Sequence, residues 1–125
     1  ASSAASDVYK RQHKDTKFKN ENHGDVSLVL MLLSIIRLLK PNILLPATTA
    51  LGTVDPLGRE KGILHGANVV MPNLSPVKHR KDYSLYDNKI CTGDEAAQCI
   101  GCLADRMKKI GYEIVTDRGD YKADI

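Results

Sequence analysis

The sequence predicts an α/β fold, and three observations lead to this class. Hydrophobic residues make up 42% of the 125 residues, which is enough for a core. Helical and extended patterns alternate between residues 25 and 73, as helix, strand, helix and strand. Both predicted strands are short apolar runs, typical of strands buried in a parallel sheet. With a right-handed crossover, this unit is part of a barrel or of a doubly wound sheet.

The first helix is predicted to begin at Asp25 or Ser27, either of which can cap it, and to run to about Lys40. Pro41 and Asn42 then end it. Because its apolar residues lie almost all round the helix, we expect it to be buried on several sides. They are Val26, Leu28, Val29, Leu30, Met31, Leu32, Leu33, Ile35, Ile36, Leu38 and Leu39.

Two short strands are predicted over residues 43–49 and 68–73. Between them we expect a loop over 52–58 and a helix over 59–65, which Gly66 ends. Beyond residue 73 the pattern changes. The sequence there predicts a helical turn over 75–83, a loop that carries Cys91, a helix from 94 or 95 to about 110, and a final strand over 112–115.

Composition and charge exclude several classes of partner. Eighteen basic and 15 acidic residues are mixed along the chain, so a net charge of +3 gives no case for nucleic-acid binding. The basic run from Lys78 to Lys81 is followed by Asp82 and is typical of a solvated helix face. The longest apolar run, from Leu28 to Leu39, is too short to span a membrane. We expect neither nucleic acid nor a membrane as a partner.

The first twelve residues, 1–12, do not match the rest of the chain. They are small and polar, show no helical or strand period, and lack the apolar region of a secretory signal. We interpret them as an unrelated leader left by cloning or sequencing, and leave them out of the fold prediction.

Three cysteines, Cys91, Cys99 and Cys102, lie within twelve residues of one another. An odd, clustered set without a signal peptide indicates a reducing cytoplasm and metal or redox chemistry. Thiolates suit zinc and iron-sulfur clusters, and Cys99 and Cys102 lie near the start of a predicted helix, where thiolate is favoured. No fourth cysteine completes the site. The alternative is three free thiols.

Thr48 and Thr49 end the first predicted strand, and Met71 ends the second. In barrels the carboxyl ends of strands carry the active site, and hydroxyl groups there can bind a carboxylate or a phosphate. The alternative is that both threonines bond to the local backbone, while Met71 belongs to the core. Because no nucleophile or acid–base set is recognisable, we predict no catalytic residue.

Four blocks of the sequence, in order, resemble the radical SAM (S-adenosyl-L-methionine) enzymes of biotin-synthase-like architecture, and among these the FeFe-hydrogenase maturases. The blocks are 45–53 (LPATTALGT), 58–60 (GRE), 66–73 (GANVVMPN) and 83–91 (YSLYDNKIC). The similarity covers residues 13 to about 121, and the spacing of the three cysteines is similar too.

The resemblance implies a (β/α)8 TIM-type barrel that binds SAM and a catalytic 4Fe-4S cluster and helps to assemble the H-cluster of FeFe-hydrogenase. Residues 13–73 would supply late βα units of a partial barrel. Residues 74–125 would form a region like the biotin and thiamin synthesis-associated (BATS) domain. The full-length enzyme would take a small-molecule substrate and work with other hydrogenase maturation proteins.

The resemblance also implies roles for eight residues. These are substrate binding for Thr48, Thr49 and Met71, SAM binding for Tyr83 and Leu85, and binding of an auxiliary 2Fe-2S or 4Fe-4S cluster for Cys91, Cys99 and Cys102. The CxxxCxxC motif that holds the catalytic cluster of this family is missing from the 125 residues. We therefore expect a C-terminal fragment that is inactive by itself. The alternative is a stand-alone iron-sulfur or zinc-binding module.

Overall fold

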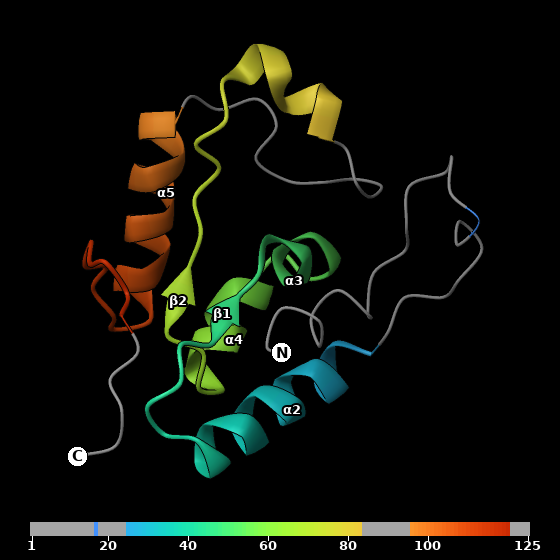
Figure 1. Ribbon diagram of the computed structural model, residues 1–125, viewed down its shortest axis with the longest axis vertical. Helices are drawn as coiled ribbons and strands as arrows, with labels where there is room; N and C mark the ends of the chain where they lie inside the picture. Colours follow the sequence, from blue (N-terminus) through green and yellow to red (C-terminus); the bar gives the residue numbers. More distant parts are fainter. Residues whose placement is uncertain (1–16, 18–24, 84–95, 121–125) are drawn as a thin grey trace.

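In the computed structural model, helices pack around a two-stranded parallel sheet (Figure 1). The structure describes Lys17 and residues 25–83 and 96–120. Its elements are α2 (Val26–Leu39), β1 (Pro46–Ala47), α3 (Thr49–Val54), α4 (Gly58–Leu64), β2 (Val69–Val70), the 3-10 helix η1 (Val77–Tyr83) and α5 (Ala96–Lys109). Mixed helices and a parallel sheet agree with the predicted α/β class. Two parallel strands joined by helices are a unit that barrels and doubly wound sheets share.

The register of the sheet is set just before the strands begin. Asn68 accepts a hydrogen bond from the Leu45 N–H through its side-chain oxygen, at 2.8 Å. Its own backbone N–H donates to the Leu45 carbonyl, also at 2.8 Å. Pro46 then pairs with Val69, and Ala47 with Val70. Both strands are shorter than predicted.

Helix α2 begins as the sequence predicts. The Asp25 carboxylate accepts a hydrogen bond from the Ser27 N–H at 2.9 Å and caps the helix. Near its other end, Arg37 donates from Nε to the Gly66 carbonyl at 2.7 Å. Gly66 has a φ of +103°, the left-handed conformation that favours glycine, and it ends α4 as predicted. Arg37 therefore attaches α2 to the turn between α4 and β2.

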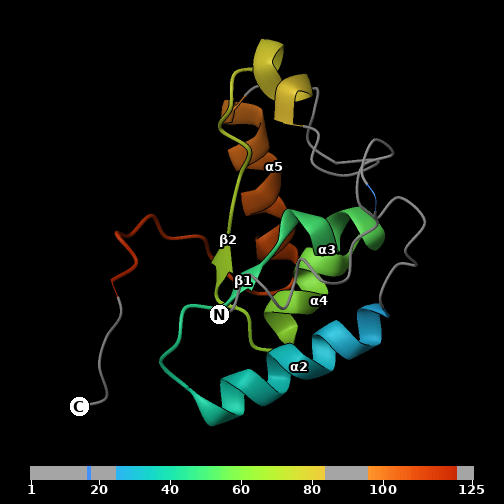
Figure 2. The ribbon, with the colours of Figure 1, turned by 45° about the vertical axis from the view of Figure 1, so that its right-hand side comes forward.

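Only one face of α2 is covered by the described residues. Val29, Leu30 and Leu33 are buried in the core, where α2 packs against α4. Five large apolar side chains on the helix are exposed, and burial on several sides is therefore a wrong expectation for the described part of the chain. They are Leu28, Met31, Ile35, Leu38 at 81% and Leu39 at 73%. The physical reason is that the other described elements lie on one side of α2 (Figures 1 and 2).

Helix α3 replaces the first half of the predicted loop over 52–58. Thr48 accepts the Leu51 N–H at 3.2 Å, so a helix begins directly after β1 and continues to Val54. A local cap of this kind can start a helix even where the sequence shows no helical hydrophobic periodicity. The early start of α3 also explains why β1 stops at Ala47.

Helix α5 lies beside β2 and the segment that leaves it, in both ribbon views (Figures 1 and 2). Its buried stripe consists of Cys99, Leu103 and Met107, spaced by four residues. Gly111, with a φ of +83°, follows the helix as predicted. The predicted strand over 112–115 is wrong, because these residues form no strand and no described strand pairs with them.

None of the described helices is long and apolar enough to cross a membrane.

The exposed apolar face of α2 should drive self-association at micromolar concentration. We expect Ile35→Lys combined with Leu38→Lys to shift the chain toward monomer in sedimentation or size-exclusion experiments, because both changes interrupt that face. Val115→Lys is the matched control, since Val115 is also exposed but lies far from α2 in sequence. A sharp monomer peak for the unmodified chain would contradict the prediction.

Candidate functional site at the carboxyl edge of the sheet

The register of the sheet brings two of the predicted substrate-binding positions together. Because Ala47 pairs with Val70, the next residues, Thr48 and Met71, follow the same edge of the two strands. Thr49 comes next as the first residue of α3. The two threonines are half-buried, and Met71 is 49% exposed, so its side chain is not the core residue that the pattern alone indicated.

The hydroxyl oxygen of Thr48 already has a structural role. It accepts the hydrogen bond that caps α3, and this agrees with the alternative interpretation of local backbone bonding. A hydroxyl group both accepts and donates, and the cap uses only its acceptor function. Thr48 can therefore stabilise α3 and still donate a hydrogen bond at this edge.

Two charged residues that the sequence analysis did not single out are buried on α4. Arg59 is 3% exposed and Glu60 is 6% exposed. In the sequence they stand in a short helix with charged neighbours, which is usual for a solvated face. Their burial follows from the glycines on either side, because a Cβ at Gly62 would lie 3.1 Å from that of Ala47. Helix α4 thus approaches β1 closely enough to enclose its first turn.

Glu60 forms an ion pair with Arg106 of α5. Arg106 donates from Nη2 to Glu60 Oε2 at 2.7 Å and from Nε to Oε1, which makes the pair bidentate. Nη2 of Arg106 also donates to the Pro56 carbonyl. Burial acts to raise the pKa of Glu60, but the hydrogen bonds from Arg106, a backbone hydrogen bond and the charges of Arg106 and Arg59 together outweigh it, and the pKa lies below its ordinary value. The ion pair attaches α5 to α4.

The two described cysteines lie one turn apart on α5. Cys99 is 3% exposed, and its sulfur accepts a hydrogen bond from the Asn73 N–H at 3.3 Å, whereas Cys102 is exposed. Residues three apart on a helix are neighbours on one face, so the pair suits two ligands of a single group. Backbone N–H donors to sulfur are also a feature of iron-sulfur sites. Donor type and spacing therefore fit, while the burial of Cys99 equally suits a free core thiol.

Cys91, the third predicted ligand, lies outside the described residues. Across residues 25–83 and 96–120, no three or more His, Cys, Asp or Glu side chains are grouped to hold a metal ion. The predicted SAM contacts are described only in part. Tyr83 ends η1, its side chain is not described, and Leu85 lies outside the described residues.

Helix η1 is attached to the segment that leaves β2 through Arg80. This buried side chain donates from Nε to the Ser75 carbonyl at 2.8 Å and from Nη2 to the Asn73 carbonyl at 3.2 Å. Asn73 also contacts Cys99 of α5 through its N–H. Asn73 therefore joins the carboxyl edge of the sheet to both η1 and α5.

Comparison with known proteins gives one clear relationship. No family model matches the chain. The FeFe hydrogenase maturase subunit HydE of Thermotoga maritima is 41% identical to it over 110 residues. That alignment covers 88% of this chain and 32% of the relative, so the chain spans about a third of the length of the protein it matches.

The Glu60–Arg106 pair provides a stability prediction. Arg106→Met should lower the free energy of unfolding by about 3 kcal/mol, because it leaves a buried carboxylate without its partner. Glu60→Met combined with Arg106→Met should cost less than the sum of the two single changes. Urea unfolding measures both effects, and Lys108→Met, an exposed change on the same helix, is the control.

The same pair should show a defined pH dependence. The pKa of Glu60 is lowered in the folded chain, so its stabilising contribution is complete above the ordinary value of 4.5 and is lost as the pH falls through the lower folded value. Glu60→Gln should remove this part of the acid sensitivity. Parallel stability curves for both proteins below pH 4.5 would show that the ion pair contributes nothing.

Proposed function

Because the chain is a sequence relative of HydE over 110 residues, we propose that it acts in FeFe-hydrogenase maturation as the C-terminal part of a radical SAM maturase. The observation that carries this proposal is 41% identity across 88% of the chain. A parallel sheet with helices between its strands is compatible with late units of a TIM-type barrel over residues 13–73. Residues 74–125 would form the BATS-like region.

We assign the carboxyl edge of the sheet to substrate binding. Thr48, Thr49 and Met71 would line the substrate cavity, and the adjacent positions of Thr48 and Met71 across the strand pair support this assignment. Hydroxyl groups supply hydrogen bonds to polar parts of a small molecule, and a methionine side chain adapts to apolar parts. Tyr83 and Leu85 would lie against SAM.

Cys91, Cys99 and Cys102 would hold an auxiliary iron-sulfur cluster, a group that stores and transfers electrons. The spacing of Cys99 and Cys102 on α5 supports this, as does the hydrogen bond from Asn73 to the Cys99 sulfur. Three thiolates leave one coordination position for water or another ligand. Other hydrogenase maturation proteins, in the cytoplasm, would be the partners of the full-length enzyme.

The proposed cluster site predicts uptake of iron and sulfide under anaerobic reconstitution. Thiolate-to-iron charge-transfer absorption should appear, and chelators should bleach it readily because one coordination position is open. Cys99→Ser with Cys102→Ser should abolish uptake, and Cys91→Ser should weaken it. The measurements are iron and sulfide content together with the absorption spectrum.

The outcomes of this experiment separate the alternatives. Equal uptake by the triple serine variant would show that the cysteines are free thiols. Zinc bound in a cysteine-dependent way, without any uptake of sulfide, would favour the stand-alone zinc module instead.

The 125 residues should not cleave SAM by themselves. The chain holds three cysteines, and their spacing does not match CxxxCxxC, so the electron donor for SAM cleavage is not encoded in them. With dithionite and SAM, 5′-deoxyadenosine should stay at the level of a control without protein. Cysteine-dependent formation of this product would show that the proposal of inactivity is wrong.

A further inference from the structure

We propose that Arg59 binds the oxyanion group of a small molecule, a carboxylate or a phosphate, at the carboxyl edge of β1 and β2. The inference rests on the proposed function in one respect, since it assumes that this edge lines a binding site. It adds an anionic substrate class to that site. The protein group that binds the oxyanion would be the guanidinium of Arg59, a residue that is 3% exposed.

The side chain of Arg59 carries an unsatisfied buried donor. Nε of Arg59 is fully buried and has no hydrogen-bond partner in the part of the chain that the structure describes. Buried polar groups in folded proteins nearly always have partners, and an exception indicates a bound water, ion or ligand, or a functional role. A buried charged group that lacks a hydrogen bond lowers the stability of the folded chain. A ligand that accepts this hydrogen bond would restore the lost stability.

The other buried or half-buried arginines each bond to another segment of the fold. Arg106 is paired with Glu60, and Arg80 donates to two backbone carbonyls. Arg37 donates to the carbonyls of Gly66 and Pro41, although its Nη2 is also buried without a partner that the structure describes. Each of these side chains joins two segments of the fold. Arg59 has no such bond among the described residues, and a purely structural role does not account for its burial.

The charges around Arg59 favour an anion. Glu60 is the neighbouring carboxylate, and both of its oxygens accept hydrogen bonds from Arg106. The charges of Arg106 and Arg59 both act to lower the pKa of Glu60, against the larger effect of burial, so both positive charges lie near this one carboxylate. One positive charge is left over in an enclosed region, and this favours an anion.

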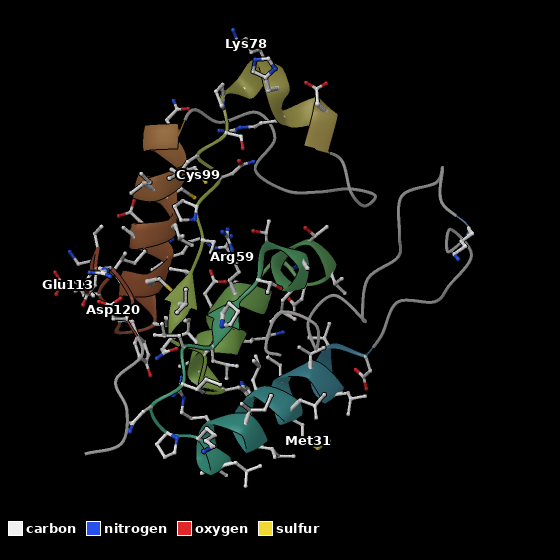
Figure 3. All side chains as sticks on the ribbon, in the orientation of Figure 1. Met31, Arg59, Lys78, Cys99, Glu113 and Asp120 are labelled. Atoms are coloured by element: carbon white, nitrogen blue, oxygen red, sulfur yellow. The ribbon has the colours of Figure 1, made fainter. Side chains whose placement is uncertain are left out.

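The position of Arg59 in the fold suits an oxyanion ligand at this edge. Arg59 lies between Gly58 and Gly62, which pack closely against Leu51 of α3 and Ala47 of β1. In the view of Figure 3 its side chain lies by the end of β1, between α3 and the segment that leaves β2. Thr48 and Thr49 occupy that end of β1. A planar guanidinium can bind an oxyanion through two N–H groups, and hydroxyl groups suit the remaining oxygens.

Hydrogen–deuterium exchange with mass spectrometry tests the proposal at submicromolar concentration of the full chain, where association is weak. Sodium acetate and potassium phosphate are titrated at constant ionic strength, with chloride as the reference anion. One or both oxyanions should slow exchange saturably in the peptide that contains α4. The acetate and phosphate arms distinguish a carboxylate ligand from a phosphate ligand.

Substitutions make the result specific to Arg59. Arg59→Met should abolish the protection, and Arg59→Lys should weaken apparent affinity about tenfold, because it keeps the charge and loses the paired donors. Arg118→Met is the matched control, since it removes an exposed guanidinium elsewhere. Without any oxyanion, Arg59→Met should raise the urea midpoint above that of the parent, because it removes the unpaired buried charge.

Absence of saturable protection in the parent would overturn the proposal, as would equal protection in the Arg59→Met variant. If Arg59→Met does not fold, the Arg59→Lys titration decides, and unchanged affinity there also overturns it. Failure of iron and sulfide uptake would count against the cluster in the proposed function and leave oxyanion binding at Arg59 intact. The two hypotheses therefore fail independently.

Discussion

The close approach of α4 to β1 is the constraint on which the rest of the structure depends. Gly62 makes it possible, because a Cβ there would crowd Ala47, and Gly58 allows an equally close approach of α4 to α3, because a Cβ there would overlap the carbonyl oxygen of Leu51. Helix α4 therefore lies against the strand at backbone distance. Any larger side chain at either glycine would move α4 outward and open the core around Leu45 and Leu51.

This packing gives adjacent residues of one short helix different environments. The first turn of α4 is enclosed, so Arg59 and Glu60 are buried although charged. Glu60 is paired with Arg106, and the pair attaches α5 to the rest of the chain. Arg59 has no equivalent partner among the described residues. The same packing therefore supports a structural ion pair and leaves the buried guanidinium that we propose as the oxyanion ligand.

Cys99 of α5 has a packing role in the structure and a ligand role in the proposed cluster site, and the two compete. The stripe of Cys99, Leu103 and Met107 belongs to the buried part of the molecule. The first two turns of α5 also present Cys99 and Cys102 at the spacing of paired ligands. The hydrogen bond from Asn73 to the Cys99 sulfur is compatible with either use, since it satisfies a backbone donor and also stabilises a thiolate. Iron and sulfide uptake, rather than geometry, separates the two.

The sequence by itself determined the features that depend on local chemistry. Asp25 caps α2, and Gly66 and Gly111 follow α4 and α5, because caps and left-handed turns act within a few residues. Alternation of helix and strand was likewise enough for the α/β class. The same alternation did not predict α3, because the capping residue Thr48 lies inside an apolar run. It also predicted a strand over 112–115 that does not form, because no described strand pairs with these residues.

Tertiary structure alone decided which residues meet. The register between Ala47 and Val70 brings Thr48 beside Met71 across 23 residues of sequence, counted from 48 to 71. Packing through glycine buries Arg59 and Glu60, although charged residues in a short helix are usually solvated. Because α2 is covered on one face only, some of its leucines are exposed, although the apolar pattern of the helix predicted that they would be buried. The physical reason is that periodicity records what a segment can bury, while only its neighbours in space determine what it does bury.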